Sequence, residues 1–208
     1  MDMHYYQPQQ GHRLPHDPFK AIVAPRPIGW IGTRSKEGVD NLAPYSFFNA
    51  FSDAPPIVGF SSMGRKDSFH NAQSTGVFTW NLATLSLAEQ MNASSEGAAP
   101  EVDEFNLAGL TAQNGKIVEA PRVAECVVSF ECRTTQCIQL QDSHGKTHDS
   151  WLLLGEVVAV HIAENMLKDG IYQTVAAEPI MRGGGPVDYF VIREDALFKM
   201  RRPQNGGL

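Results

Sequence analysis

The chain has 208 residues, of which 42% are hydrophobic, and it carries a formal net charge of -6. This length can bury the core of one sandwich or barrel domain, and the acidic balance argues against a nucleic-acid partner. No apolar run is long enough to cross a bilayer and the polar N-terminus lacks a signal-peptide core, so we expect a cytoplasmic protein without a membrane partner. The three cysteines, Cys126, Cys132 and Cys137, form neither an even set nor a CxxC pair, and we interpret them as buried small residues.

The first residues follow neither the period of a helix nor that of a strand. His, Gln, Pro and Tyr are frequent in residues 1–17, so we predict an irregular arm there that is able to wrap a neighbouring molecule. We predict one domain over 18–194. A tail over 195–208 follows it and is expected to fray.

Three strands are predicted early in the domain. Residues 28–33 are short and apolar, and residues 43–51 follow as their partner across the turn at 37–41. Gly38 and Asn41 tolerate the positive φ that hairpin turns require. Pro55 and Pro56 cannot donate to a sheet, so they break the chain before a third strand at 57–62.

A short helix and a fourth strand come next. We expect Asp67 or Ser68 to cap a helix that runs to about Ser74 and is closed by Gly76. Residues 77–82 alternate as a strand, and the apolar residues of 85–91 recur at helical spacing. The stretch 93–121 is rich in Ser, Gly, Ala, Pro and acidic residues, which predicts a long surface excursion that serves a site or a dimer contact.

The second half of the chain has the pattern of a long hairpin. Residues 125–140 alternate clearly, turn at 142–146, and return as an antiparallel neighbour over 151–162. A short helix or turn at 165–170 and a last strand at 187–192 complete the series. About seven strands with few helices predict a mainly β fold, an antiparallel barrel rather than a doubly wound sheet.

Familiar catalytic motifs are missing from the sequence. It contains no nucleophile elbow, no GxGxxG fingerprint, no Walker loop and no HExxH helix. Flavin mononucleotide (FMN) needs none of these, because a phosphate cradle, main-chain donors along a strand and a slot for the ring suffice to hold it. Our hypothesis is that FMN lies across residues 26–71.

A phosphate would be held where charge-assisted donors converge. The candidates are Arg65, Lys66, Ser68 and Ser62, together with the amides that open the following helix. Asp67 is acidic and cannot face the phosphate, so we assign it to capping or to orienting Lys66. The competing interpretation of residues 65–68 is an exposed charged turn.

The ring would lie along residues 46–49. Ser46 and Asn49 can offer side-chain hydrogen bonds, and the main chain of Phe47 and Phe48 can address the pyrimidine edge of the ring. Because strand residues alternate between faces, the four side chains cannot all touch one ring, and some contacts must come from the main chain. Core packing of the two Phe residues remains the competing interpretation.

The histidines give weak signals. His144 and His148 are four residues apart, a spacing that suits one face of a helix, but a turn is expected there, so we predict no metal site. His161 is more typical of a hydrogen-bonded sheet residue than of a catalyst. Hydride transfer to a flavin demands no general base, so we assign no catalytic side chain.

Several blocks of sequence together resemble the flavin reductase-like, FMN-binding split-barrel family that includes flavoredoxins. The similarity covers about residues 18–192. The blocks are RPIGWIGT at 26–33, NLAPYSFFNA at 41–50, KDS at 66–68 with Asn71, TG at 75–76, NLAT at 81–84, DEF at 103–105, AGL at 108–110 and GEVV at 155–158.

The resemblance implies a split β-barrel homodimer that binds FMN non-covalently near the subunit interface. It also implies reduction of the flavin by NADH or NADPH. Carried over by position, one segment resembles the ring-binding residues, a second resembles the phosphate and ribityl residues, and two further residues are expected to line the site. The ring-binding set is Ser46, Phe47, Phe48 and Asn49. The phosphate and ribityl set is Ser62, Lys66, Asp67, Ser68 and Asn71. The two further lining residues are Trp30 and Thr33.

We therefore expect an FMN-dependent oxidoreductase that uses NAD(P)H to reduce free flavin, a ferric complex or a partner protein. One departure from the family concerns the nicotinamide. Many relatives carry a His five residues before the Gly of the Gly-Glu-Val segment, whereas here Ser150 stands in that place and His148 lies two residues earlier. The alternative is an FMN-binding electron carrier or flavin-binding module without its own nicotinamide site.

Overall fold

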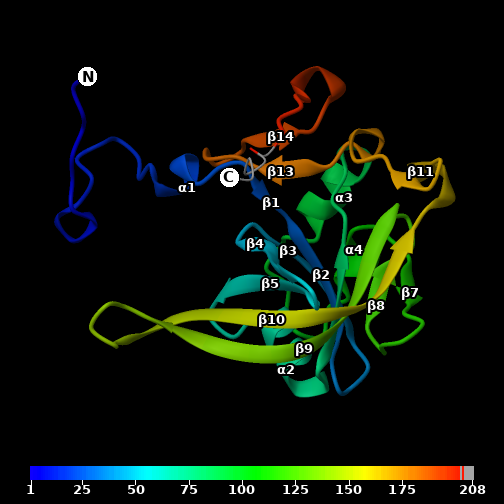
Figure 1. The fold of residues 1–208 in the computed structure, drawn as a ribbon. Coiled ribbons are helices and arrows are strands. Elements are labelled where there is room, and N and C mark those ends of the chain that lie inside the picture. Colours follow the sequence, from blue (N-terminus) through cyan, green and yellow to red (C-terminus); the bar gives the residue numbers. More distant parts are fainter. Residues whose placement is uncertain (202, 204–208) are drawn as a thin grey trace, which may run out of the picture.

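A seven-stranded antiparallel sheet forms the centre of the molecule (Figure 1), in the strand order β3-β2-β6-β9-β10-β5-β4. The computed structural model describes residues 1–201 and 203. The strands of this sheet are β2 (Gly29–Arg34), β3 (Asp40–Tyr45), β4 (Phe48–Asp53), β5 (Pro56–Met63), β6 (Val77–Asn81), β9 (Val128–Gln141) and β10 (Thr147–Ile162).

Smaller elements surround this sheet. The other strands are β1 (Arg26–Pro27), β7 (Ala112–Asn114), β8 (Pro121–Val123), β11 (Leu167–Lys168), β12 (Ile171–Tyr172), β13 (Ile180–Arg182) and β14 (Tyr189–Val191). The α-helices are α1 (Phe19–Ile22), α2 (Asp67–Thr75), α3 (Ala88–Ala93) and α4 (Glu104–Leu107). Turns of 3-10 helix are η1 (Pro8–Gln10), η2 (Leu85–Leu87), η3 (Glu164–Met166), η4 (Val175–Ala177) and η5 (Glu194–Ala196).

The two edge strands of the sheet are neighbours in the chain. β3 pairs with β2 and β4 pairs with β5, yet only Ser46 and Phe47 separate β3 from β4. The amide of Ser61 on β5 donates to the Phe47 carbonyl at 2.8 Å. The sheet is thus curled so that its edges meet at these two residues, which we call the seam bend.

The seam bend corrects one prediction. A single strand over 43–51, partner of 28–33, is wrong in its second half, because the chain leaves β2 at Tyr45 and joins β5 from Phe48. Strand-forming residues run through the whole stretch, so nothing local marks the change of partner. Closure of the barrel, a property of all the strands together, determines it.

The turns largely follow their local chemistry. Gly38 closes the β2–β3 hairpin with φ of 90°. At the tip of the β9–β10 hairpin, which projects from the barrel in Figure 1, the Asp142 carboxylate accepts the amides of His144 and Lys146 at 2.9 and 3.0 Å. The predicted long hairpin is therefore confirmed, with β10 beginning four residues earlier than expected.

Helix α2 follows the predicted span but not the predicted cap. Gly76 ends it in the left-handed conformation with φ of 77°, as expected. Lys66 is the N-cap residue and no side chain caps the helix, so the capping assigned to Asp67 or Ser68 is wrong. The Ser68 hydroxyl instead donates to the Asn41 side chain at 2.8 Å.

Apolar side chains are buried on both faces of β2. Trp30 belongs to a cluster with Leu42, Met91 and Phe105, whereas its neighbour Ile31 belongs to a second cluster with several aromatic residues. The second cluster consists of Ile31, Val58, Phe60, Phe69, Ala72, Phe78, Cys132 and Leu153. Residues of α2 pack in this second cluster, and residues of α3 and α4 pack in the first.

The N-terminal arm lies outside these clusters. The arm contains only the short turn η1 and extends away from the barrel (Figure 1). The tail predicted to fray over 195–208 falls partly outside the described residues. No helix among the described residues is long and apolar enough to span a membrane.

Candidate functional site

A cavity of about 480 Å³ opens beside the seam bend, and we call it the seam cavity. Three segments form its wall: the stretch from Ala43 to Phe47, the start of α2, and the loop at 94–98. Its lining residues are Lys20, Asn41, Ala43, Pro44, Tyr45, Ser46, Phe47, Ser61, Met63, Lys66, Asp67, Ser68, Ser94, Ser95, Glu96, Gly97, Ala98 and Glu104.

Five predicted site residues meet at this cavity: Ser46, Phe47, Lys66, Asp67 and Ser68. The Lys66 side chain is exposed at the N-terminus of α2. The first amides of a helix have no intrahelical acceptor, and the helix dipole adds partial positive charge at the same end. This end of the cavity therefore suits an anionic group.

The seam bend presents unused main-chain donors. The carbonyls of Ser46 and Phe47 accept from the Arg26 side chain and the Ser61 amide. Within the described part of the chain, the amides of Ser46 and Phe47 donate to no protein acceptor. Because both residues line the cavity, these two amides are available to the acceptor atoms of a bound heteroaromatic ring.

A buried polar network supports the floor of the cavity. The Ser68 hydroxyl donates to Asn41 Oδ1, and Asn41 Nδ2 donates to Glu104 Oε2, each at 2.8 Å. Glu104 also accepts the Leu42 amide at 3.1 Å. Burial raises the pKa of the Glu104 carboxyl, although these hydrogen bonds oppose the shift. The network fixes the position of Ser68 at the cavity wall.

Thr33 and Asn71 lie behind this wall rather than in it. Thr33 Oγ1 donates to Asn41 at 3.2 Å and accepts from Asn71 Nδ2 at 3.3 Å. Thr33 is 0% and Asn71 5% exposed. Ser62 is also buried and donates to the Gly64 carbonyl. The structure therefore makes these three residues supports of the cavity, not lining residues.

Trp30 does not line the cavity either, which corrects the expectation. Its side chain is 0% exposed, and its indole N–H donates to the Ser94 hydroxyl at 2.9 Å. Ser94 is itself buried and begins the 94–98 loop. Trp30 thus contributes indirectly, because it anchors the loop that forms one wall.

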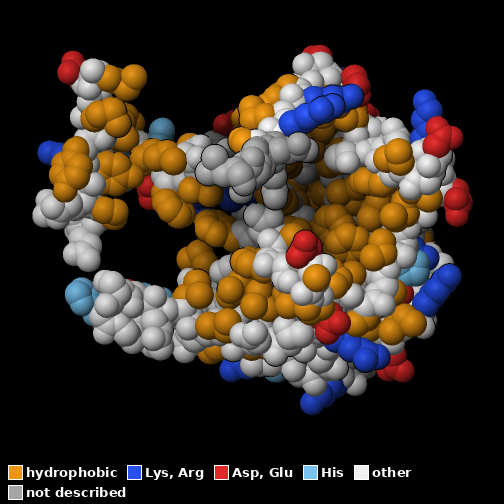
Figure 2. All heavy atoms as spheres, viewed as in Figure 1, with side chains coloured by type: hydrophobic (Ala, Val, Ile, Leu, Met, Phe, Trp, Pro, Cys, Tyr) orange, Lys and Arg blue, Asp and Glu red, His pale blue; other side chains and the backbone are white. Residues whose placement is uncertain are grey.

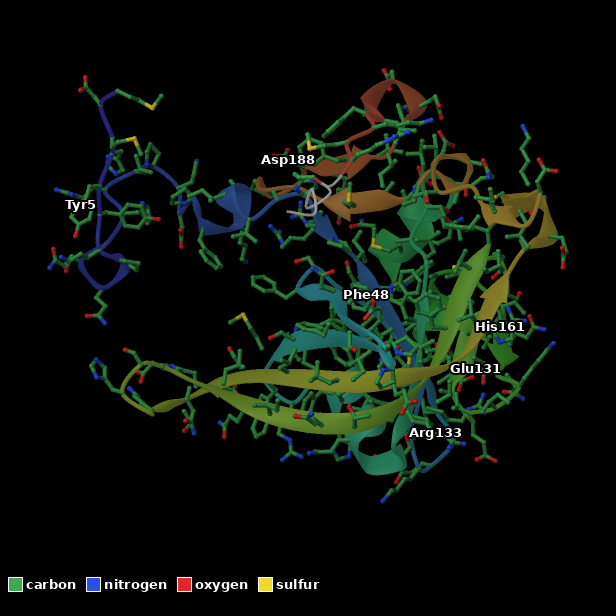
Figure 3. The ribbon with its side chains drawn as sticks, in the orientation of Figure 1. Tyr5, Phe48, Glu131, Arg133, His161 and Asp188 are labelled. Carbon is green, nitrogen blue, oxygen red and sulfur yellow. The ribbon has the colours of Figure 1, made fainter. Side chains whose placement is uncertain are left out.

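Three other predicted residues point elsewhere. Phe48 stacks on Trp80 with parallel rings 5.6 Å apart, and Figure 3 shows it beside the strands of the barrel. Asn49 is exposed and accepts the amide of Ala50. Arg65 lies over the Trp151 ring at 5.3 Å and bonds to Gln73. Strand alternation explains Phe48 and Asn49, and aromatic stacking explains Arg65.

Sequence reasoning missed several lining residues. Tyr45 and Met63 flank predicted residues, but no pattern marks them. The 94–98 loop lies in the excursion over 93–121 that is predicted to serve a site or a dimer contact, but nothing in the sequence marks its individual residues. Asn41 and Glu104 both fall in blocks that carry the family resemblance, which was the available signal. Lys20 lies on α1, far from the site in sequence, and no local pattern marks it.

His161 and His148 each contact a carboxylate of the protein. His161 Nε2 lies 2.6 Å from Glu131 Oε1, and Figure 3 shows the two side chains together. His148 lies 3.2 Å from Asp142 at the hairpin tip. In the described residues no group of three or more His, Cys, Asp or Glu side chains could hold a metal ion.

The chain belongs to the flavin reductase-like family, because the model described as "Flavin reductase like domain" matches residues 23–180. It is thus a member of an oxidoreductase-type enzyme family, and the predicted antiparallel split-barrel fold is confirmed. An uncharacterized protein of Aquifex aeolicus (strain VF5) is 36% identical over 170 residues, which cover 79% of this chain and 83% of that protein.

Two solved structures show the same fold. Nitrilotriacetate monooxygenase component B from Bacillus cereus superposes with a TM-score of 0.86 at 28% identity, covering 96% of this chain and 100% of that one. Flavoredoxin of Desulfovibrio vulgaris (Miyazaki F) gives a TM-score of 0.75 at 20% identity, covering 85% and 91%.

Proposed function

We propose that this protein is an FMN-dependent oxidoreductase that takes a hydride from NADH or NADPH and passes the electrons to free flavin, a ferric complex or a partner protein. The seam cavity is the observation that carries the proposal. Its volume of about 480 Å³ lies within the usual range of ligand sites. The wall of this cavity contains Lys66 at the start of α2, which suits the phosphate of FMN. It also contains the amides of Ser46 and Phe47, which have no acceptor among the described residues and suit the ring.

The residues present fit FMN end to end. The phosphate would meet Lys66 and the amides at the start of α2, at one end of the cavity, whereas the buried Ser68 hydroxyl donates to Asn41 and supports this end. The ring would meet the free amides of Ser46 and Phe47. Asp67 lines the cavity beside Lys66, where it would orient the ammonium group rather than touch the phosphate.

When bound, FMN would supply the hydride acceptor and the route for electrons onward. The chain's own residues would position the reactants and limit access of water. Phe47, which is 43% exposed, and Met63, which is 77% exposed, stand at the cavity with apolar surface that a bound ring would cover. No side chain has to act as a general base for this reaction.

Flavin bleaching tests the proposal directly. The purified protein reconstituted with FMN should be yellow, and anaerobic addition of NADH or NADPH should abolish the flavin absorbance in a stopped-flow measurement. Bleaching by neither nicotinamide would remove the reductase proposal and leave FMN binding untouched.

Replacement of Lys66 tests where the phosphate lies. Lys66→Ala should weaken FMN binding by about 1.5–3 kcal/mol, because it removes a charge-assisted hydrogen bond. Arg65→Gln is the matched control, since the neighbouring guanidinium lies over Trp151 and away from the cavity. FMN titration followed by fluorescence quenching measures both, and equal affinity of the Lys66 variant and the native protein would show that the tail lies elsewhere.

One observation favours the alternative, an FMN-binding electron carrier without its own nicotinamide site. Ser150 pairs with Met63 across β10 and β5, and Met63 lines the seam cavity. The position where many relatives carry a His therefore lies near the site, but here it offers only a hydroxyl. A carrier would be reduced by dithionite or by a partner reductase, and not by nicotinamide.

We also propose that the protein is a homodimer. A hollow of about 500 Å³ is lined almost wholly by apolar residues of β9, β10, β13 and their neighbours, including Phe130, Val160 and Ile162. Figure 2 shows hydrophobic side chains gathered in this hollow. Val160 is 53% exposed, and such apolar surface is typical of contacts between subunits.

A further inference from the structure

A second cavity of about 440 Å³ adjoins the seam cavity on the side of the N-terminal arm. Its wall comes from residues 16–21, from Arg26 on β1, and from the turn that follows Arg182 on β13. We call it the arginine cavity. Lys20 and Ser46 line both cavities, so the two share a wall at the seam bend.

Arg26 is a buried cation held by main-chain carbonyls. Its side chain is 8% exposed and donates to the carbonyls of Ser46, Lys20, Val23 and Gly183. No carboxylate of the described residues forms an ion pair with it. Carbonyl oxygens fix the direction of a guanidinium but do not cancel its charge, so the positive charge of Arg26 remains uncompensated.

Arg182 repeats this arrangement on β13, where it is the cross-strand partner of Arg26. It donates to the carbonyls of Gly185, Asp188 and Pro186 at 2.6–2.9 Å and lies over the Tyr189 ring at 4.8 Å. It likewise forms no ion pair with the described carboxylates. Burial and the nearby charge of Arg182 both lower the pKa of Arg26, a sign that the two cations repel each other.

The lining of this cavity carries a net positive charge. Its lining contains the cations Lys20, Arg26 and Arg182 and the single acid Asp17, which gives 3 − 1 = +2 with His16 neutral. The whole chain carries -6. A concave surface of net positive charge inside a protein of net negative charge concentrates the field on a small bound anion.

FMN has one phosphate, and the seam cavity already offers Lys66 and a helix start for it. We propose that the arginine cavity binds an anionic group of the second small-molecule substrate, namely the pyrophosphate of a nicotinamide dinucleotide or a carboxylate of comparable charge. This inference rests on the proposed function. Arg26 and Arg182 supply the field, and the exposed Lys20 ammonium supplies the donor that can move to meet the ligand.

Lys20→Gln tests the proposal without disturbing the fold, because Lys20 is exposed and only its carbonyl serves Arg26. Lys168→Gln, at an exposed position of β11, is the matched control. Flavin bleaching is measured with NADPH or NADH and with N-benzyl-dihydronicotinamide, which carries the same reducing ring but no phosphate. FMN affinity is measured in parallel.

The expected pattern is selective. Lys20→Gln raises the concentration of dinucleotide needed for half-maximal bleaching about tenfold, as for a lost hydrogen bond to a charged group. The response to N-benzyl-dihydronicotinamide, measured at an FMN concentration that saturates each variant, changes far less, and Lys168→Gln behaves like the native chain. An equal loss with both donors at saturating FMN would overturn the proposal.

Direct binding separates this proposal from the proposed reductase activity. If neither donor bleaches the flavin, calorimetric titration of the FMN-loaded protein with inorganic pyrophosphate and with citrate still reports on the cavity. Binding of either anion that is lost in Lys20→Gln but retained in Lys168→Gln supports the site, and the stronger of the two identifies the chemistry. Absence of Lys20-dependent binding for both anions overturns it.

Discussion

Glu131 on β9 is a buried carboxylate that holds the loop at 116–118 by accepting hydrogen bonds from its main-chain amides. It is 0% exposed and accepts the amides of Lys116, Ile117 and Val118 at 2.6–2.8 Å, as well as His161 Nε2 at 2.6 Å. Burial alone would raise the pKa of this carboxyl, but the hydrogen bonds lower it from 4.5 to about 2. The ionised form is therefore the one that the fold stabilises.

This shift predicts a defined pH dependence. Because the folded pKa lies below the unfolded one, the contribution of Glu131 is complete above about pH 4.5 and is lost as the pH falls toward 2. Glu131→Gln should lower the free energy of unfolding at pH 7 by about 1–3 kcal/mol and flatten its slope in that acid range. Urea unfolding at several pH values measures both effects.

Glu156→Gln is the control for this experiment, since Glu156 is exposed on the neighbouring strand β10. Its unfolding curves should follow those of the native chain at every pH. Equal acid slopes for Glu131→Gln and the native protein would contradict the assigned role.

Gly155 is a position at which no side chain fits. A Cβ at this position would lie 2.3 Å from the ring of Phe78, whose side chain is fully buried, and 3.2 Å from the Arg133 carbonyl. Gly155→Ala should therefore destabilise the protein by about 1–3 kcal/mol, as overpacking of a core does. The melting temperature measures this loss, and Gly97→Ala, where a Cβ meets nothing within 4 Å, should leave it unchanged.

At the scale of elements, the C-terminal end of α2 requires Gly76 for its backbone conformation rather than for its small size. A Cβ there would meet nothing within 4 Å, yet φ is 77°. Gly76→Ala should cost about 1 kcal/mol of stability because the left-handed conformation is unfavourable for Ala. Gly76→Asn should recover part of that loss, since Asn tolerates this conformation. Thermal unfolding of the pair distinguishes this cause from a steric one, for which the larger Asn would be the worse residue.

The elements also show what the sequence could and could not predict. Hydrophobic patterning and turn residues predicted β2, β5, β6 and the β9–β10 hairpin, because both signals depend only on residues that are neighbours in the sequence. The division of 43–51 at the seam bend depends on which distant strand each half meets, and no local signal carries that. For the same reason the sequence does not show which residues of the 93–121 excursion, or that Lys20, reach the site, although a site was one expected role of that excursion.

The site residues divide in the same way. The position of Lys66 at the cavity was predictable because a cation at a helix start suits a phosphate whatever surrounds it, whereas the donation of the Ser68 hydroxyl to Asn41 was not. The roles of Trp30 and Arg65 were not, because burial against Ser94 and stacking on Trp151 depend on elements far apart in the chain.

For the whole molecule, the apolar hollow at β9 and β10 predicts a dimer. Light scattering after size exclusion should give the mass of two chains. Val160→Lys should shift the equilibrium toward one chain, because a charge would be buried in the contact. Val187→Lys, at a valine that is 82% exposed and outside the hollow, should leave the dimer intact. A dimer unaffected by Val160→Lys would place the contact on another face.

The seam bend has a consequence for solubility. β3 and β4 are the edges of the sheet, and exposed edges can pair with strands of other molecules and lead to aggregation. A flat ligand that accepted hydrogen bonds from Ser46 and Phe47 would cover the junction of those edges. The group that performs the chemistry would then also keep this junction from pairing with a strand of another copy.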